Sequence, residues 1–445
     1  MWERLRSIWT VPDLRNKILF TLGILLVYRI LAHIPVPLTH QEQLNLANLV
    51  SNPKSQDLSQ LLGLLDVFSG GSLQQFSIVA MGVYPYITAT IVMQLLQPII
   101  PALQNLSQEG EAGRLRFSQI TRMIAVPLAF LQALGQVALF VNANVLDPNT
   151  FNLLGPQWLQ TLAILMTLTA GTIILVWLGE LITENGIGNG VSLIIFGGIV
   201  SRIPSFVQQG LLAGSSTGGS NGPVSIGIFL LIGLVTIFGI VYVYQGQRRV
   251  PVQYPTKRMV GRGMLVGSAQ TTYIPLQVNS AGMIPLIFAQ SILIFPAVLA
   301  RYLSASPTPW LRDSSLWVAT YLVNPSLWWY AVAFGVLVVM FTFFYATVLW
   351  QQQNIPENLQ KQGAFIPGYR PGEPTRKHME GILYRITLGG ALFLGVVAAL
   401  PYLSRVGGNQ LLSSTSVLIV VGVVLDTVKQ LEAQMVMRNY SGFLS

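Results

Sequence analysis

The sequence predicts an all-α polytopic membrane protein, and three observations support this fold class. Of the 445 residues, 52% are hydrophobic and only 9% are charged, whereas a soluble domain carries about 25% charged residues. The mean hydropathy is positive, at +0.58. Apolar runs of about 20 residues, enough for one helical crossing, recur along the chain. A surface this poor in charge would not keep a protein of this length dispersed in water.

We predict ten such runs as transmembrane helices, which places both termini on one side of the membrane. In chain order the predicted spans cover residues 18–38, 75–98, 118–142, 158–179, 190–210, 225–244, 280–300, 328–350, 382–402 and 414–434.

The basic residues predict which side of the membrane is cytoplasmic. Cytoplasmic loops carry an excess of Lys and Arg. Most of the 25 such residues lie near the two termini or in the loops after even-numbered spans. The exceptions are Arg29, Lys54, Arg202, Arg301, Arg312 and Arg405. Both termini and the loops after spans 2, 4, 6 and 8 are therefore expected in the cytoplasm.

The chain lacks residues on which several function classes depend. It has no cysteine and three histidines, which are not spaced as metal ligands, so we predict no metal, no cofactor and no catalytic residue. A phosphate-binding glycine loop is also missing. Glu180, Asp426 and Arg29 lie near span ends, whereas ion-coupled transporters usually need ionisable groups inside the bilayer. A transporter of a small apolar solute stays open as the alternative to a channel.

A polar, glycine-rich break precedes the second span. It reads Phe68-Ser69-Gly70-Gly71-Ser72, inside an uncharged stretch longer than one crossing needs. Non-helical backbone at membrane depth persists only where protein covers it or where it lines a wet cavity. One interpretation is a half-helix near 60–70 that re-enters the protein, a break at Gly70-Gly71, and a full span. The other is an ordinary extracellular loop, and the sequence does not separate the two.

A second glycine-rich stretch opens span 5. The residues from Asn185 to Gly190 predict a tight turn or cap, after which Val191, Ile194 and Ile195 share one helical face. A plain capped helix that packs this face in the core is the simpler interpretation.

Two loops, 245–278 and 351–381, are much longer than the others, and such loops are usually functional or disordered. In 245–263, Val and Tyr alternate with other residues, as in a short β-hairpin. Residues 363–375 contain three Gly and three Pro around Arg370, and proline stiffens the backbone. Basic charge that only sets orientation would need no rigidity. Stiff basic tips favour docking sites for a cytoplasmic partner with acidic or phosphate groups.

Six segments, in order and across nearly the whole chain, resemble the SecY family of protein-translocation channels. They are VFSGGSLQQFSIVAMGVYPYI (67–87), WLGELITENGIGNGVSLIIF (177–196), QGQRRVPVQY (245–254), VNSAGMIPLIFAQSIL (278–293), GAFIPGYRPGEPT (363–375) and TSVLIVVGVVLD (415–426). The short C-terminal tail resembles the cyanobacterial or plastid branch.

The resemblance implies two inverted halves of five spans. Residues 1–215 would hold spans 1–5 and a plug half-helix near 60–72, and residues 216–445 would hold spans 6–10 and both long cytoplasmic loops. The implied function is a channel without catalysis of its own. It passes unfolded preproteins and nascent chains across the membrane and releases transmembrane segments sideways into the lipid bilayer. The implied partners are SecE and SecG, with the ATPase SecA or the ribosome as driver. The implied location is the bacterial inner membrane, or the thylakoid membrane for the cyanobacterial or plastid branch.

The family's functional positions map onto this sequence residue by residue, with the lateral gate between spans 2 and 3 and spans 7 and 8. The resemblance assigns Val83, Ile87, Val191, Ile195, Ile287 and Ile419 to a pore ring, and Phe68, Ser69, Gly70, Gly71 and Ser72 to the plug. It assigns Thr88, Pro285 and Gln290 to the lateral gate, and Arg248, Arg249, Lys257, Arg258, Arg262 and Arg370 to the SecA or ribosome site.

An apolar ring gates by dewetting and offers ions no ligands. Because two of the six positions are valine, the seal is expected to depend more on the plug than it would with an all-isoleucine ring. Pro285 is expected to weaken the first half of span 7 and to help the gate flex, with a merely tolerated membrane proline as the other interpretation.

Overall fold

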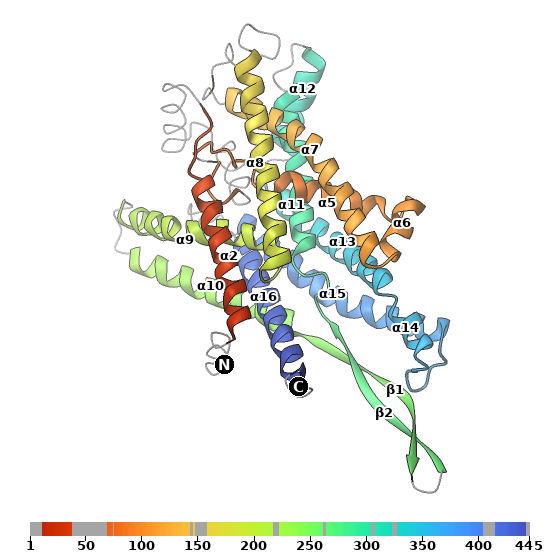
Figure 1. Cartoon of the computed structure of the whole chain (residues 1–445). Coiled ribbons are helices and arrows are strands. Elements are labelled where there is room, and N and C mark those ends of the chain that lie inside the picture. Colours follow the sequence, from red (N-terminus) through yellow and green to blue (C-terminus); the bar gives the residue numbers. More distant parts are fainter. Residues whose placement is uncertain are drawn as a thin grey trace.

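The structure is a computed structural model, and it describes residues 11–37, 69–73, 75–142, 146, 158–216, 222–260, 264–303, 308–322, 327–403 and 414–441. This part of the chain is a bundle of helices from which one β-hairpin extends (Figure 1). Its helices are α2 (Pro12–Leu31), α5 (Tyr84–Leu96), α6 (Pro101–Gln108), α7 (Glu111–Asn142), α8 (Trp158–Asn185), α9 (Gly190–Ser216), α10 (Gly222–Gln245), α11 (Ile284–Leu303), α12 (Pro309–Trp317), the π-helical turn η1 (Val318–Leu322), α13 (Trp328–Gln353), α14 (Ile355–Lys361), α15 (Glu373–Leu403) and α16 (Ser414–Ser441). The strands are β1 (Gln247–Val260) and β2 (Met264–Gln277).

Each predicted span overlaps a helix of the structure. Within the described part of the chain, four helical segments are apolar enough, by length and composition, to cross a membrane: Leu115–Ala138, Trp158–Asn185, Trp328–Lys361 and Glu373–Ala399. Shorter apolar helices lie at Gly190–Pro204, Gly233–Gln245 and Ile284–Ile294. These results bear out a helical membrane protein, and the count of ten crossings stays a prediction.

The prediction for span 2 was wrong at its start, because α5 begins only at Tyr84 and not near residue 75. The preceding residues form turns, with φ of 45° at Phe76 and 59° at Gly82, values that a right-handed helix does not contain. Pro85 then fits the first helical turn, where its missing N–H breaks no hydrogen bond. At 1.5 Å per residue, α5 is about 20 Å long.

The non-helical stretch before α5 is packed inside the protein. Leu73, Phe76 and Ala80 belong to a buried cluster with side chains of α7 and α8. The Val36 N–H donates to the Phe76 carbonyl at 2.9 Å, and the Ile78 N–H donates to the Ile34 carbonyl at 3.0 Å. Protein therefore covers this backbone and pairs part of it, as membrane depth requires. The ordinary extracellular loop does not fit residues 69–73 and 75–83, whereas most of the expected half-helix near 60–70 lies outside the described residues.

The predicted turn before span 5 is confirmed. Helix α8 ends at Asn185, and α9 starts at Gly190 after a left-handed residue, Gly188, with a φ of 82°. The Asn189 Oδ1 caps α9 by accepting from the Ser192 N–H at 3.2 Å. This cap fixes the direction in which the apolar face of α9 enters the core.

The two long loops differ from their predicted forms. Residues 247–260 and 264–277 pair as two antiparallel strands of 14 residues each, much longer than expected for a short hairpin. Most of 351–381 is helical, because α13 runs to Gln353, α14 follows directly, and α15 begins at Glu373. The left-handed Asn354, with a φ of 44°, separates α13 from α14. Only about the central third of this loop is non-helical.

The hairpin strands (247–260 and 264–277) and the second long loop (351–381) pack together as one unit, which we call the platform. Val250, Val252, Ala364 and Ile366 are buried in one cluster with residues of α13, α14 and α15. Gln253 and Phe365 exchange two backbone hydrogen bonds, of 2.9 and 3.0 Å. In Figure 1 the start of α2, the end of α16 and the hairpin all lie at one end of the bundle. The loops with the most basic residues thus share one end with both terminal helices.

Candidate functional site

The six residues assigned to a ring come together in one apolar cluster at the centre of the bundle. Helix α5 brings Ile87, with Val83 directly before it, and α9 brings Val191 and Ile195. Helices α11 and α16 each bring one residue, Ile287 and Ile419. These positions are up to 336 residues apart in sequence, from 83 to 419, so the tertiary structure alone creates the cluster.

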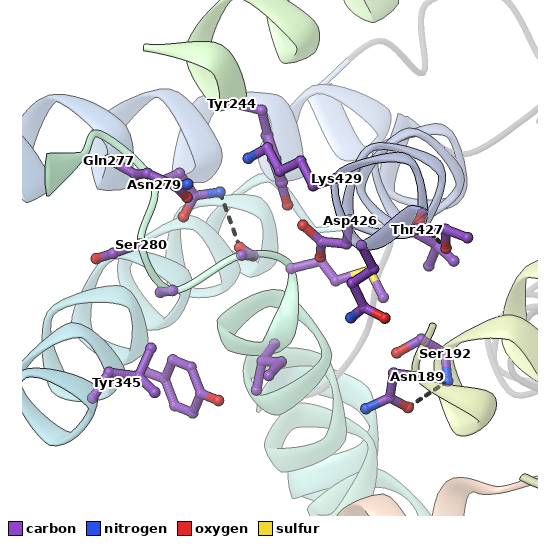
Figure 2. Close-up of a pocket in the computed structure, with 17 residues that line it drawn as sticks. Asn189, Ser192, Tyr244, Gln277, Asn279, Ser280, Tyr345, Asp426, Thr427 and Lys429 are labelled. Carbon is purple, nitrogen blue, oxygen red and sulfur yellow. Dashed lines mark hydrogen bonds between the residues drawn. The ribbon is translucent and has the colours of Figure 1, made fainter. Parts of the chain in front are cut away.

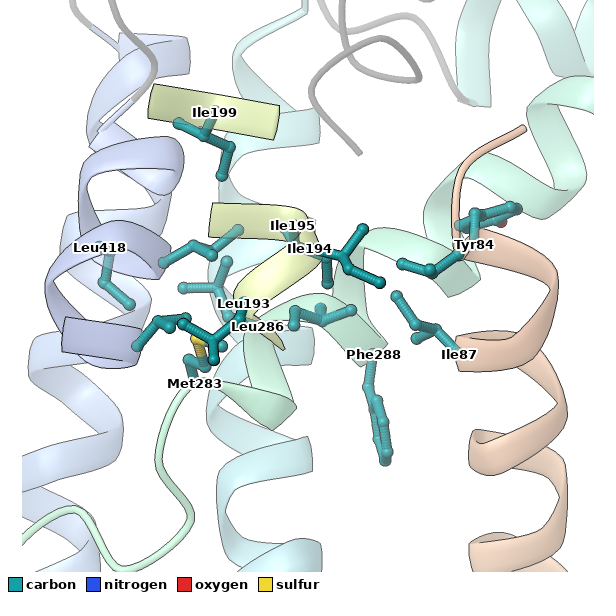
Figure 3. Packing of buried hydrophobic residues seen from close by; sticks show 14 of the residues in the cluster. Tyr84, Ile87, Leu193, Ile194, Ile195, Ile199, Met283, Leu286, Phe288 and Leu418 are labelled. Carbon is teal, nitrogen blue, oxygen red and sulfur yellow. The ribbon is translucent and has the colours of Figure 1, made fainter. Parts of the chain in front are cut away.

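Five of the six side chains are buried. Val83 and Ile419 are 0% exposed, and Ile87, Ile195 and Ile287 are 7%, 2% and 6% exposed; Val191 is partly buried against them. Figure 3 shows Ile87, Ile195 and Leu286 converging from α5, α9 and α11. Apolar side chains that meet between α5, α9, α11 and α16 exclude water and offer an ion no ligands.

The glycine break packs directly against α9. Gly70 and Gly71 have φ of 63° and 89°, so the predicted break at these residues is confirmed. A Cβ at Gly198 of α9 would lie 2.7 Å from the Gly70 Cα, closer than real Cβ atoms come. Two glycines thus let two backbones touch, and any side chain at this contact would push them apart.

Helix α2 holds the same break through polar contacts. The Tyr28 hydroxyl donates to the Ser69 carbonyl at 3.1 Å, and Arg29 Nη1 donates to the Gly70 carbonyl at 3.1 Å. Ser72 Oγ donates to the carbonyls of Ser69 (2.6 Å) or Val79 (3.0 Å). The Ser69 and Gly70 carbonyls are therefore paired, although Gly70, Gly71 and Ser72 are not helical. Phe68, assigned to the plug, lies outside the described residues.

The seam between α5 and α11 carries the residues assigned to the lateral gate. The Tyr84 hydroxyl donates to the Ser291 carbonyl at 3.1 Å and joins the two helices. Thr88 accepts from Gln132 Nε2 of α7 at 3.3 Å. Gln290 is 2% exposed, and its Oε1 is buried without a hydrogen-bond partner among the described residues. A seam that holds unpaired polar groups is easier to part than a purely apolar one, because water satisfies those groups once it opens.

The expectation that Pro285 weakens span 7 was wrong. Pro285 is the second residue of α11, which begins at Ile284, and a proline in the first turn removes no intrahelical hydrogen bond. The proline inside this helix is Pro296. Pro285 therefore starts the helix and does not loosen it.

Five of the six basic residues assigned to partner binding lie on the platform. Arg248 and Arg249 are exposed at the start of β1, and Arg370 is exposed at the tip of the loop. The Thr375 hydroxyl donates to the Arg370 carbonyl at 2.7 Å, and Gly368 and Gly372 turn the chain on either side with positive φ. The loop is thus fixed by its turns as well as by its prolines. Lys257 and Arg258 belong to β1 but their side chains are not described, and Arg262 lies outside the described residues.

Sequence reasoning missed the residues that hold these parts in place: Tyr28, Arg29 and Gly198 at the break, and Tyr84, Gln132 and Ser291 at the seam. No local pattern marks them, since each acts on a partner far away in sequence. Among the described residues, no group of three or more His, Cys, Asp or Glu side chains is placed to hold a metal ion.

Comparison with known proteins gives a consistent result. The SecY family model matches residues 77–428. The protein translocase subunit SecY of Mycobacterium tuberculosis (strain ATCC 25618 / H37Rv) is 42% identical over 443 residues, which cover 97% of each chain. That of Streptomyces scabiei is 42% identical over 444 residues, again 97% of each chain.

Solved structures share the fold. The structure of a protein-conducting channel has a TM-score of 0.62 at 18% identity, covering 94% of this chain and 92% of that one. Sec61 in the canine ribosome–channel complex from the endoplasmic reticulum has a TM-score of 0.59 at 18% identity, with the same coverage. The family model and the two relatives together establish that this chain, a multi-pass membrane protein, belongs to the SecY family of protein-translocation channels.

Proposed function

We propose that the chain forms the pore of a protein translocase through the ring of Val83, Ile87, Val191, Ile195, Ile287 and Ile419, and that it catalyses no reaction itself. The observation that carries this proposal is that five of these side chains are buried in one apolar cluster at the centre of the bundle, with Val191 packed against it. Such a ring seals by dewetting and imposes no sequence requirement on a chain that passes through it.

In the resting state, the break at Ser69, Gly70, Gly71 and Ser72 acts as the plug that reinforces this seal. Its contacts with α2 and α9 support this role, because they hold uncharged backbone inside the bundle. Residues 1–215 and 216–445 form the two halves between which the channel opens.

Sideways release occurs at the seam between α5 and α7 on one side and α11 and α13 on the other. The structure packs α11 against α5, α7 and α13. A segment exposed there moves into the lipid if its free energy of membrane insertion is favourable. An apolar residue at the helix centre contributes roughly −0.3 to −0.6 kcal/mol to this free energy, whereas a charged residue adds roughly 2.5 to 3.5 kcal/mol.

The platform receives the driving partner, SecA or the ribosome, through Arg248, Arg249 and Arg370. Their exposure supports this assignment, together with the shared core that fixes hairpin and loop. SecE and SecG complete the complex. We place both termini in the cytoplasm, in a bacterial inner membrane or, for a cyanobacterial or plastid chain, a thylakoid membrane.

A cysteine cross-link tests the pore, because the chain has no native cysteine. Ile287→Cys is reconstituted with SecE, SecG, SecA and ATP, and a preprotein with a single cysteine is arrested in transit. We expect an ATP-dependent disulfide between the cysteine introduced by Ile287→Cys and the cysteine of the preprotein, since Ile287 is assigned to the ring. A preprotein that reaches SecA but never links to this position would overturn the pore and favour the small-solute transporter.

Replacing Tyr84 by Phe is expected to ease sideways opening. The change removes the hydroxyl that bonds to the Ser291 carbonyl across the seam. One such hydrogen bond contributes about 1 kcal/mol, so the open form should become about fivefold more populated. We expect preproteins with weakly apolar segments to integrate into the membrane more often, measured as the integrated fraction across a hydrophobicity series.

Tyr321→Phe is the matched control, since Tyr321 is 60% exposed and its hydroxyl makes no hydrogen bond to any residue that the structure describes. Equal integration by both variants would show that the Tyr84 hydroxyl does not restrain the gate.

A further inference from the structure

A short helix with an exposed aromatic face lies at the end of the bundle opposite the hairpin (Figure 1). It is α12, which continues into the π-helical turn η1, and both pack against α11. No role assigned above uses this helix. The polar cavity of about 370 Å³ that is lined in part by Gln277, Asp426 and Lys429 (Figure 2) lies instead on the hairpin side of the ring, within the proposed channel.

Helix α12 is too short and too charged to cross the membrane. Its nine residues span about 14 Å at 1.5 Å per residue, whereas the hydrocarbon core of a bilayer is about 30 Å thick. Arg312 and Asp313 lie near its middle, with 3.4 Å between Arg312 Nε and Asp313 Oδ1, and both side chains are exposed. A helix with this charge pair belongs outside the hydrocarbon core.

One face of α12 and η1 is nevertheless aromatic. Trp310, Trp317 and Tyr321 are 76%, 57% and 60% exposed. Trp310 and Trp317 are seven residues apart, which is about two helical turns, so they share a face. The ring centroids of Trp317 and Tyr321 are 6.1 Å apart. Ser315 is buried on another face, and Arg312 lies on the flank opposite the tryptophans.

The aromatic face lies at the level where neighbouring helices begin. Helices α8 and α13, both apolar enough to cross a membrane, start with Trp158 and Trp328, which are 51% and 72% exposed. Helix α12 precedes α13 in the chain, and α8 starts at the same end of the bundle as α12 (Figure 1). Tryptophan and tyrosine are enriched where a membrane meets water, because each has an apolar ring and a polar N–H or O–H. These aromatic side chains together mark such a boundary.

The surroundings of α12 favour lipid over a protein as the partner of this face. The two membrane helices that flank α12 in the chain expose large apolar side chains, Leu299 of α11 and Val332 and Val336 of α13, as lipid-facing helices do. The centre of a protein interface is depleted in charged residues, whereas Arg312 and Asp313 share this short helix with the tryptophans. A charged pair fits the headgroup layer, where a long arginine side chain reaches polar groups.

We infer that α12 and η1 lie in the interfacial layer of the bilayer, with Trp310, Trp317 and Tyr321 between the headgroups and the upper acyl chains, and that they anchor this end of α11. Helix α11 also carries Gln290 and Ser291 of the seam. The anchor thus holds one side of the proposed gate at a fixed depth while the seam opens. This consequence rests on the proposed function, whereas the position of α12 does not.

A spin label tests the position of α12, because the chain has no native cysteine. Ser314→Cys places a nitroxide on the aromatic face, about one turn after Trp310, and keeps all three aromatic rings. The full chain is reconstituted with SecE and SecG, without SecA, in vesicles of phosphatidylcholine and phosphatidylglycerol. Oxygen concentrates in lipid and a nickel chelate stays in water, so the ratio of their collisions with the label measures its depth.

Tyr273→Cys on β2 and Val336→Cys on α13 are the controls for water and for lipid, since these side chains are 57% and 53% exposed. We expect the oxygen-to-nickel ratio of the Ser314→Cys label to lie between those of the two controls. A ratio equal to that of Tyr273→Cys would place α12 in water. A label that neither agent reaches would place the face against protein, either a second copy or a partner subunit. Each of these two results would overturn the inference.

A second label tests the anchor. Leu299→Cys reports the mobility of α11 near its end, at a side chain that is 45% exposed. In a chain that also carries Trp310→Ser and Trp317→Ser, we expect this label to become more mobile, with narrower spectral lines, because two of the three interfacial rings are lost.

Trp158→Ser is the matched control, because it removes an exposed tryptophan at the same end of the bundle but on α8. We expect the spectrum of the Leu299→Cys label to stay parental in this variant. Equal spectra for the double serine variant and the Trp158→Ser variant would show that α12 does not anchor α11. Neither label requires translocation, so a failed cross-link at Ile287→Cys would leave both results standing.

Discussion

Gly198→Ala is expected to make the resting channel leak ions. The new Cβ would lie 2.7 Å from the Gly70 Cα and 3.0 Å from the Tyr28 hydroxyl. The first neighbour is backbone and cannot rotate away, so the glycine break must move off α9. Overpacking of this kind costs about 1–3 kcal/mol, which shifts a closed–open equilibrium by about 5- to 150-fold. Potassium release from vesicles that contain the complex without SecA measures the leak.

Gly197→Ala is the control on the same helix. Its Cβ would meet only the Leu25 Cδ2 at 3.1 Å, the end of a flexible side chain that can yield. We expect this variant to seal like the parent, and both variants to translocate preprotein with SecA and ATP. If Gly198→Ala translocates normally and also retains potassium, the contact between Gly70 and Gly198 does not hold the channel closed.

Arg370→Glu is expected to uncouple the channel from its driver while the fold and the ion seal persist. The Arg370 side chain is exposed, and it makes no hydrogen bond or ion pair among the described residues. Only its backbone carbonyl is used, by Thr375, and the substitution keeps that group. Charge reversal at a docking contact costs several kcal/mol, so we expect SecA-dependent translocation to fall at least about tenfold. Translocation rate and SecA affinity are measured on the same vesicles.

Lys361→Glu is the matched control, because Lys361 is also basic and exposed and ends α14 beside the loop. A general loss of positive charge would impair both variants equally. That outcome would contradict a specific role for Arg370, as would an Arg370→Glu variant that binds SecA like the parent.

The sequence by itself determined the features that depend on neighbours along the chain. Apolar runs located the helices, because burial of a side chain in lipid is decided by its own chemistry. The turns at Gly70-Gly71 and before Gly190 followed from the conformational freedom of glycine. The hairpin in 245–278 followed from alternation near its first strand, although the length of its strands did not.

Only the tertiary structure decided which distant residues meet. That α5 starts at Tyr84, after a buried stretch without helix, depends on the cover that α7 and α8 provide. The bonds from Tyr28 to Ser69 and from Tyr84 to Ser291 join residues 41 and 207 positions apart. A polar side chain pairs with whatever the folded chain places within about 3 Å, and no local pattern in the sequence records that neighbour.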